Sequence, residues 1–267
     1  MSTVVRSSLC SVVVGALVVL AAHAQNNTVL FQDDFNVSGL STSAWSVGSN
    51  FIGPRTQLGN TPTFGTDGDG TKYATLIFDT YNASYPGQYF KGTEILTRQS
   101  FDVNQGIIFE ARVRCRKVMS GQVCSAFTYF YEDPLTDEID FEFLTKQPTN
   151  TILATTWNDW DYRPDDYSNP LYYSSRQVTN NFNRAAWNTL EIVWLPGYIE
   201  WYVNGQCVRA TTNAVPDSAM NFRLNFWAPG SGWTDAYNAN LKPASKSRSN
   251  VRYYYDVDYA RVTQLGP

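Results

Sequence analysis

Histidine is almost absent from this sequence of 267 residues: the single copy is His23, close to the N-terminus. Catalytic sites of the Ser-His-Asp and Cys-His kinds need an imidazole beside the nucleophile, and many zinc sites use one as a ligand. If the segment that contains His23 is removed after synthesis, the mature chain has no histidine. Acid–base chemistry near neutral pH then falls to carboxylates, tyrosine or lysine.

Long hydrophobic runs are also missing, apart from a short one near the N-terminus. Arg6 precedes a stretch rich in Val, Leu and Ala at 9–20, and Ala22-His23-Ala24 has the A-x-A pattern of a signal-peptide cleavage site. The stretch is too short to cross a bilayer comfortably. We therefore expect a signal peptide at 1–24 and a secreted, extracellular mature chain at 25–267, rather than a membrane anchor.

Basic residues are few, since 20 Lys and Arg are set against 24 Asp and Glu. Loss of Arg6 with the signal peptide leaves 19 against 24, a net charge of −5. The basic residues form no cluster along the chain, so nucleic acid and membranes are not expected as partners, and a neutral ligand fits better. Because no linker, charge block or internal repeat divides the chain, we expect a single domain and a monomer.

Only four cysteines are present, and Cys10 lies in the expected signal peptide. Cys115 and Cys124 flank residues 119–122, which resemble the tip of a hairpin. In an oxidising compartment this spacing predicts a disulfide between them. Cys207 is then left over, and three unpaired core cysteines are the alternative.

Sequons for N-glycosylation occur three times, each with the pattern N-x-Ser/Thr. They begin at Asn26, Asn36 and Asn82. A secreted chain would expose such sites to glycosylation, so these residues are expected to be modified.

Helical periodicity is nearly absent, whereas short segments that alternate apolar and polar residues recur between turn signals. The pair Asn204-Gly205 is a strong signal for a tight turn. This many strands without helices predicts an all-β fold, either a sandwich of two sheets or a barrel. The predicted strands span 73–79, 106–114, 125–131, 137–144, 151–157, 189–195, 198–203, 220–226 and 252–263.

The most informative segment is 137–144, in which acids alternate with large apolar residues. The acids on one face of the predicted strand are Glu138, Asp140 and Glu142, and the apolar residues on the other face are Ile139, Phe141 and Phe143. Like charges in a row repel one another, so a purely structural strand gains nothing from them. A charged stripe that faces solvent is the alternative.

The spacing of Glu138 and Glu142 suits a pair of catalytic carboxyls. Positions i and i+4 of a strand lie about 13 Å apart at Cα, and side chains that lean together close much of that gap. A retaining glycosidase needs its two carboxyls about 5 to 5.5 Å apart, and an inverting one about 6.5 to 9.5 Å apart. The spacing permits the retaining geometry without requiring it.

Aromatic residues make up 15% of the sequence, and some of them stand beside Asn, Asp or Gly instead of apolar neighbours. Trp157, Trp227 and Trp233 are of this kind. Rings beside amides and acids are typical of a cleft that stacks sugar rings and binds their hydroxyls. Packing in the core is the alternative for each of them.

The acid segment resembles the E-x-D-x-E signature of glycoside hydrolase family 16, which includes lichenases, laminarinases and xyloglucan transglycosylases. The resemblance extends over nearly all of the mature chain. It implies a β-jelly-roll sandwich of two antiparallel sheets, similar to concanavalin A. The segments that carry it are GTEI at 92–95, GIIFEAR at 106–112, WLPGYIEWYVNG at 194–205, RLNFW at 223–227 and VDYARV at 257–262.

Transferred residue by residue, the resemblance implies a nucleophile at Glu138, a general acid/base at Glu142 and a supporting carboxyl at Asp140. It also implies substrate contacts from Glu94 and from Trp157, Trp227 and Trp233. No cofactor is expected. Asp258 matches a position that helps to hold a structural calcium in some relatives, although a hydrogen-bonding aspartate is the preferred interpretation.

The chain departs from the family pattern at two places. Thr136 stands where lichenases commonly have an aromatic residue, and Leu96 stands where an arginine is expected. Substrate preference is therefore open, while the chemistry is not. The resemblance implies a secreted, retaining endo-β-glucanase acting on β-1,3-, β-1,4- or mixed-linked glucan, with a cell-wall transglycosylase and a non-catalytic carbohydrate-binding protein as alternatives.

Overall fold

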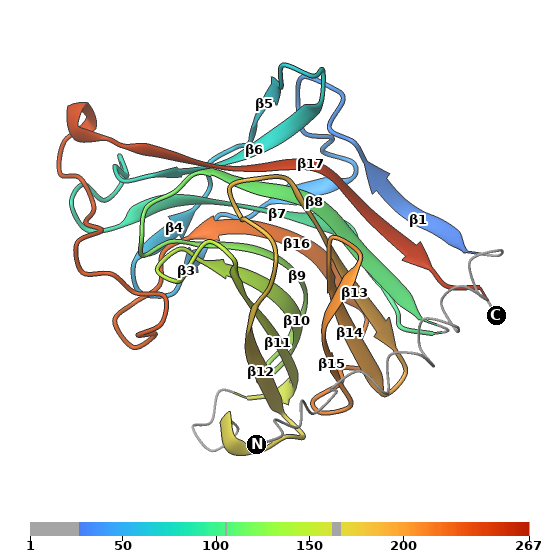
Figure 1. Ribbon diagram of the computed structural model, residues 1–267. Helices are drawn as coiled ribbons and strands as arrows, with labels where there is room; N and C mark the ends of the chain where they lie inside the picture. The colour runs from blue at the N-terminus through green and yellow to red at the C-terminus, as the bar shows by residue number, and fades with distance from the viewer. Residues whose placement is uncertain (1–26, 105, 162–166, 267) are drawn as a thin grey trace, which may run out of the picture.

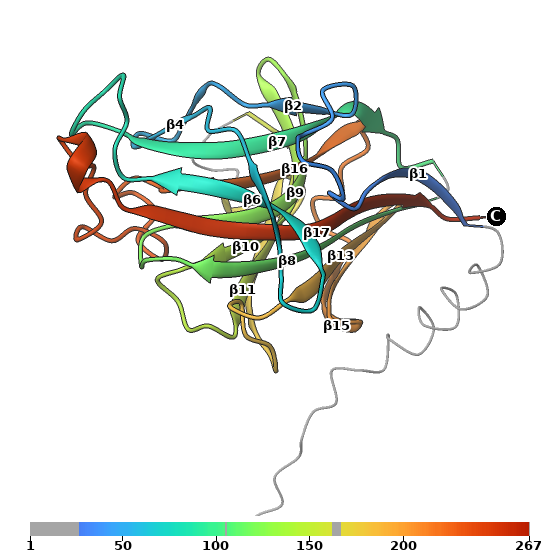
Figure 2. The same cartoon turned by 90° about the horizontal axis from the view of Figure 1, so that it is seen from above.

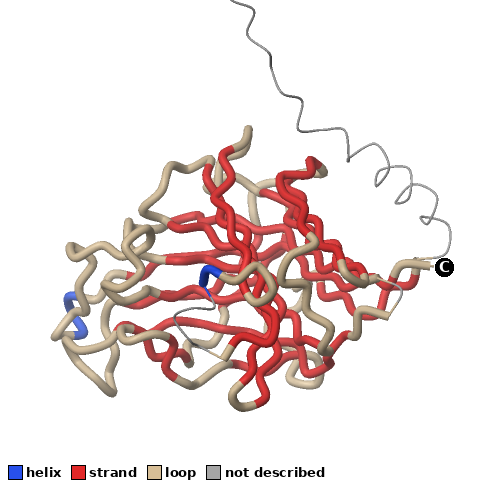
Figure 3. Tube along the Cα trace, turned by 90° about the horizontal axis from the view of Figure 1, so that it is seen from below, coloured by secondary structure: helices blue, strands red, loops and turns tan. Residues whose placement is uncertain are grey.

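The computed structural model describes residues 27–104, 106–161 and 167–266. The expected signal peptide and the sequon at Asn26 lie outside these residues. Strands dominate the described chain, and its helical segments are short 3-10 turns such as η2 (Ser247–Ser249) (Figure 3). No helix in the described part is both long enough and apolar enough to span a bilayer.

Two antiparallel sheets face one another and bend together (Figure 1). The first, which we call the front sheet, contains the acid segment near its middle. Its strands, in spatial order, are β2 (Trp45–Val47), β7 (Phe90–Phe101), β16 (Met220–Trp227), β9 (Val123–Glu132), β10 (Leu135–Leu144), β11 (Thr151–Trp160) and β12 (Tyr173–Thr179).

The second, or back, sheet packs behind it, and its strands run beside one another in the view from above (Figure 2). The end of its strand β17 (Arg252–Gln264) also pairs with β1 (Thr28–Asp33). The start of β7 joins the sheets, because its Lys91 pairs with Asp79 at the end of β6 (Lys72–Asp79). The same part of β7 also pairs, in parallel, with β4 (Thr56–Leu58), whose other neighbour is β3 (Phe51–Ile52). The back sheet has the order β15 (Gln206–Thr211), β14 (Tyr198–Val203), β13 (Asn188–Leu195), β8 (Ile107–Lys117), β17 (Arg252–Gln264), β6 (Lys72–Asp79) and β5 (Thr63–Thr66).

Large aromatic and aliphatic side chains from both sheets fill the core between them. Trp194 and Trp201 of the back sheet are fully buried, as are Phe141 and Phe143 of β10. The indole Nε1–H of Trp201 donates a hydrogen bond of 2.9 Å to the backbone oxygen of Asp140. A back-sheet side chain thus fixes the backbone of the strand that carries the acids.

The predicted all-β sandwich is confirmed, and each predicted strand is present with boundaries shifted by a few residues. Strand β7 was not predicted, although it runs for 12 residues. Its polar members Thr93, Glu94 and Thr97 are buried, so they obscure the usual alternation of inward apolar and outward polar residues. The tight turn at Asn204-Gly205 is confirmed, since both residues have positive φ and join β14 to β15.

The predicted disulfide is not present in the structure: Cys115 and Cys124 are both buried free thiols. Residues 118–122 do not form a hairpin tip, because β8 belongs to the back sheet and β9 to the front sheet. The two side chains therefore meet inside the core, where burial and a hydrogen bond with Cys115 raise the pKa of Cys124. A neutral buried thiol is the unreactive form. Cys207 is half-buried, and its thiol donates to the backbone oxygen of Arg209 at 3.5 Å.

The sequon prediction is wrong at Asn82, whose side chain is 1% exposed. Its Nδ2 donates hydrogen bonds to Gln57 Oε1 at 3.0 Å and to the Phe90 carbonyl at 3.3 Å. The nitrogen that would carry a glycan is thus occupied inside the protein. Asn36 is exposed, and its glycosylation stays a prediction.

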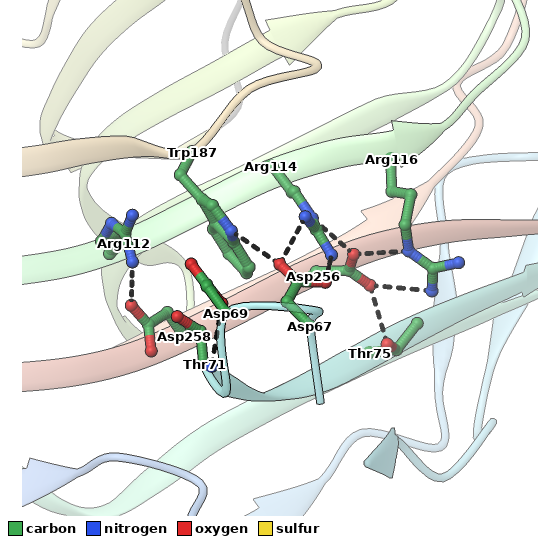
Figure 4. A network of polar contacts seen from close by, with 10 residues as sticks. All are labelled: Asp67, Asp69, Thr71, Thr75, Arg112, Arg114, Arg116, Trp187, Asp256 and Asp258. Atoms are coloured by element: carbon green, nitrogen blue, oxygen red, sulfur yellow. Dashed lines mark hydrogen bonds and ion pairs between the residues drawn. The ribbon is translucent and has the colours of Figure 1, made fainter. Parts of the chain in front are cut away.

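A network of charges holds the outer surface of the back sheet together (Figure 4). The fully buried carboxylate of Asp256 accepts from Thr75 Oγ1 at 2.7 Å, from Arg114 Nε at 2.9 Å and from Arg116 Nε at 2.6 Å. The other two nitrogens of Arg114 donate to Asp67, each at 2.8 Å. The network therefore ties the turn after β5 to β8 and β17.

Replacement of Asp256 by Asn should destabilise the fold by about 3 kcal/mol, since it removes a buried negative charge and leaves two guanidinium groups facing an uncharged amide. Urea unfolding followed by tryptophan fluorescence measures the loss. Asp69→Asn is the control, because Asp69 is exposed and is hydrogen-bonded locally to Thr71, so its midpoint should hardly move. A loss below about 1 kcal/mol in Asp256→Asn would show that the network does not stabilise the fold.

Candidate active site

Strand β10 places the acid segment on two faces, as its alternation predicts. Ile139, Phe141 and Phe143 are at most 1% exposed and belong to the core. The intervening Glu138, Asp140 and Glu142 point to the opposite face and line a cavity. Because one face is anchored in the core, the other face can place three carboxyls in a row.

The cavity has a volume of about 910 Å³ and lies over the front sheet. Every catalytic and substrate-binding residue expected from the sequence lines it. Besides the three acids of β10, these are Glu94, Trp157, Trp227 and Trp233. They come from separate parts of the chain: Glu94, Trp157 and Trp227 lie on strands of the front sheet, and Trp233 lies on the segment that follows β16.

Hydrogen bonds from neighbouring strands hold two of the acids. Asp140 Oδ1 accepts from the backbone N–H of Thr155 on β11 at 3.1 Å. Glu142 Oε1 accepts from the hydroxyl of Ser125 on β9 at 3.3 Å. Ser125 lies directly opposite Glu142, and Thr155 lies directly opposite Asp140. The sheet register thus fixes both carboxyl groups.

Burial and mutual repulsion make all three acids hard to ionise. Burial raises the pKa of Glu138, and the charges of Glu142 and Glu94 raise it further. Burial and the charges of Glu142 and Glu138 raise the pKa of Asp140, and burial raises the pKa of Glu142. Because the groups interact, they lose their protons as one unit. At neutral pH the row therefore retains protons, as general acid catalysis requires.

Strand β16 supplies a second polar surface, which the sequence reasoning did not assign to the site. Asn225 Nδ2 donates to Glu94 Oε2 at 3.3 Å, and Arg223 Nη1 lies 3.6 Å from Glu94 Oε1. Arg223 is directly opposite Leu96, so an arginine of β16 stands beside the position where the family pattern expects one on β7. The alternation of Arg223, Asn225 and Trp227 with Leu224 and Phe226 was the available signal.

Aromatic rings form the walls of the cavity. The ring of Trp157 lies 4.1 Å from that of Trp160, 4.1 Å from that of Tyr173 and 5.4 Å from that of Tyr167, all between centroids. At another part of the wall, Trp227 and Trp233 lie 5.9 Å apart. Flat apolar faces beside polar groups suit a chain of sugar rings.

The comparison with known families agrees with this arrangement. Residues 65–255 match the family described as glycosyl hydrolases family 16. The chain belongs to this family. It is a glycoside hydrolase with an all-β jelly-roll fold, as the sequence resemblance predicted.

Several relatives of this family 16 glycoside hydrolase are β-glucanases. The β-glucanase of Brevibacillus brevis is 30% identical over 194 residues, which cover 69% of this chain and 67% of the relative. That of Bacillus licheniformis is 33% identical over 139 residues, about half of either chain.

Solved structures of family members share the fold. The B. licheniformis β-glucanase superposes with a TM-score of 0.64 and 21% identity, covering 88% of this chain and 97% of the other. A family 16 endo-glucanase from Bacteroides ovatus, in complex with G4G3G-2F-DNP, gives a TM-score of 0.66 at 13% identity, covering 87% and 99%.

The calcium position suggested by the resemblance carries an ion pair in this family 16 chain. The carboxylate of Asp258 binds the guanidinium of Arg112 (Figure 4). Within residues 27–104, 106–161 and 167–266, no three carboxylate, thiol or imidazole groups gather in a way that would hold a metal ion. In the described chain the Asp258 carboxylate is thus paired with an arginine, and the structural calcium suggested by the resemblance stays a prediction.

Replacement of Glu138 by Gln should stabilise the protein at pH 7.5 but not at pH 4. A carboxyl with a raised pKa in the folded state binds more protons than the unfolded chain between its two pKa values, so stability falls as pH rises through that interval. Gln removes this loss, with an expected gain of about 1.4 kcal/mol for each unit of pKa shift. Urea midpoints at the two pH values measure it.

The matched control is Glu132→Gln, on the exposed end of β9, which should leave the urea midpoint unchanged at both pH values. An equal gain at pH 4 and pH 7.5 in Glu138→Gln would contradict the explanation, because it would not depend on ionisation.

Proposed function

We propose that the mature chain is a secreted, retaining endo-β-glucanase that hydrolyses β-1,3-, β-1,4- or mixed-linked glucan. The observation that carries the proposal is the row of Glu138, Asp140 and Glu142 on the floor of a cavity of about 910 Å³ with aromatic walls. The A-x-A cleavage pattern before Gln25 supports secretion. The expected monomer and the absence of other partners belong to the same proposal.

The proposed reaction has two displacements at the same carbon. The carboxylate of Glu138 attacks the anomeric carbon while Glu142 gives its proton to the leaving oxygen of the glycosidic bond. This step forms a glycosyl ester on Glu138 and releases one part of the glucan. Glu142 then takes a proton from water, whose oxygen attacks the same carbon and frees Glu138. The configuration of the sugar is retained because it is inverted twice.

Asp140 lies between the two glutamates and adds a third charge to the group. Its carboxylate is held by the Thr155 backbone N–H, so it stays fixed while protons move between its neighbours. Once Asp140 is ionised, its negative charge opposes loss of a further proton from the row. We assign to it the maintenance of one protonated glutamate at neutral pH.

The choice of glucan as substrate rests on two observations. The cavity wall offers rings for stacking and amide and carboxylate groups for hydroxyls, which suits an uncharged polysaccharide. The relatives from Brevibacillus brevis and Bacillus licheniformis carry the name β-glucanase. The chain's net negative charge also fits a neutral substrate better than an anionic one.

Replacement of Glu138 by Gln should reduce the release of reducing ends from barley mixed-linked glucan by at least about 10⁴-fold, because the amide cannot form the ester. Small nucleophiles such as azide should restore cleavage in Glu138→Ala, with inversion of the product. Glu132→Gln should retain wild-type activity. Near wild-type activity in Glu138→Gln would rule out this residue as the nucleophile.

Product sizing on end-labelled glucans separates the proposed function from its alternatives. Short oligosaccharides of several lengths at early times indicate endo-hydrolysis. Products longer than the substrate indicate transfer of the glycosyl group to another sugar, as in a transglycosylase. Tight binding without any product after long incubation indicates a carbohydrate-binding protein.

A further inference from the structure

Arg223 stands out among the described residues that line the cavity, because it is the one basic side chain among four carboxylic acids. Its row across the front sheet runs from Arg223 on β16 through Phe127 on β9 to Asp140 on β10. The side chain is 19% exposed. A largely buried cation thus faces the acid row from two strands away.

The guanidinium is held in place but is not fully paired. Its carbon lies 4.4 Å from the centre of the Tyr129 ring, and Nη2 donates a hydrogen bond of 3.4 Å to Asn221 Oδ1. The long ion pair of 3.6 Å with Glu94 fixes one side of the group. Its Nε–H, however, is buried and has no hydrogen-bond partner. An unpaired buried donor costs about 1 to 3 kcal/mol, so it is kept only where something binds to it.

Two further unpaired groups lie on the same face of β16. They are Asn225 Oδ1 and the indole Nε1–H of Trp227, both buried and both at the cavity wall. From Arg223 to Trp227 along β16, the three unpaired groups are a donor, an acceptor and a donor. A sugar hydroxyl both donates and accepts, so adjacent hydroxyls of one ring can satisfy such a series. Separate water molecules could satisfy each group wherever it lay, so the placement of all three groups on one face of β16 favours a single ligand.

The positive charge of Arg223 also treats the two glutamates of the acid row differently. It favours the ionised form of Glu138 and so lowers the pKa of this group against the effect of burial. For Glu142, the group that lowers the pKa is the Ser125 hydroxyl. Burial raises the pKa of each glutamate to about 8, so the cation near Glu138 and the hydroxyl bonded to Glu142 are what distinguish the surroundings of the two carboxyls. The titratable groups around Glu138, besides Arg223, are Asp140 and Glu142 on β10, Glu94 on β7, Tyr129 on β9 and Tyr173 on β12.

We propose that Arg223 is a positioning residue with two separable roles: its charge makes Glu138 rather than Glu142 the nucleophile, and its free Nε–H binds a glucan hydroxyl. The inference rests on the proposed function. The first role needs only a cation, whereas the second needs the planar guanidinium with its donor at Nε. A lysine should therefore retain the first role and lose the second.

The test compares Arg223→Met and Arg223→Lys with the wild type in pH profiles of kcat/KM on barley mixed-linked glucan. The acidic limb reports ionisation of the nucleophile. In Arg223→Met it should move up by about half a pH unit or more, because the nearby positive charge is gone. In Arg223→Lys it should stay in place, while KM rises roughly tenfold through the lost hydrogen bond.

Arg176→Met is the matched control. Arg176 is exposed on β12, opposite the buried Ala154, and does not line the cavity, so its loss should change neither the limb nor KM. Urea midpoints confirm that each variant is folded, and Arg223→Gln, neutral and polar, replaces Arg223→Met if that variant unfolds.

The outcomes separate the inference from the function beneath it. If the wild type is active and the neutral Arg223 variant keeps both the acidic limb and the KM of the wild type, the inference about Arg223 is wrong and the proposed function stands. Equal behaviour of Arg223→Lys and the neutral variant overturns the division into two roles. A wild type that cleaves no glucan removes the proposed function and the inference with it.

Discussion

The alternation of side chains along β10 is the constraint on which the site depends. Ile139, Phe141 and Phe143 are enclosed between the sheets, and burial of each large apolar side chain stabilises the fold by about 2 kcal/mol. A slip of one residue would move these side chains to the cavity and place three carboxyls in the core. The hydrogen bond from Trp201 to the backbone of Asp140 adds a second restraint on register. The packing of one face thus specifies the chemistry of the other.

The same arrangement works against stability, since three acids share a poorly solvated surface and each raises the proton affinity of its neighbours. Other parts of the molecule offset this. On the outer surface of the back sheet, every oxygen of the buried Asp256 carboxylate is matched by arginine or threonine donors. The charges around Asp256 are therefore paired with opposite charges, whereas the acids of β10 repel one another. This division is expected of an enzyme whose active site is strained and whose scaffold is not.

The front sheet also places a guanidinium beside the position where the family pattern expects one. Leu96 on β7 departs from the family pattern, yet the side chain directly opposite it in the sheet is Arg223 of β16. Neighbouring strands are about 4.8 Å apart, so a long side chain from either one reaches the same region. The sequence pattern shows that the expected arginine is missing at Leu96. The register of the sheet shows in addition that the guanidinium of Arg223 lies beside that position.

The sequence by itself determined the fold class, most strands and the acid row, because a period of two places residues on faces without reference to the rest of the chain. Only the tertiary structure decided which elements pair. It buried Asn82, placed Cys115 and Cys124 on different sheets as free thiols, and brought Arg223 beside Glu94. These outcomes depend on register and on sheet membership, which are set by contacts between residues far apart in the chain. Local alternation carries no information about such contacts.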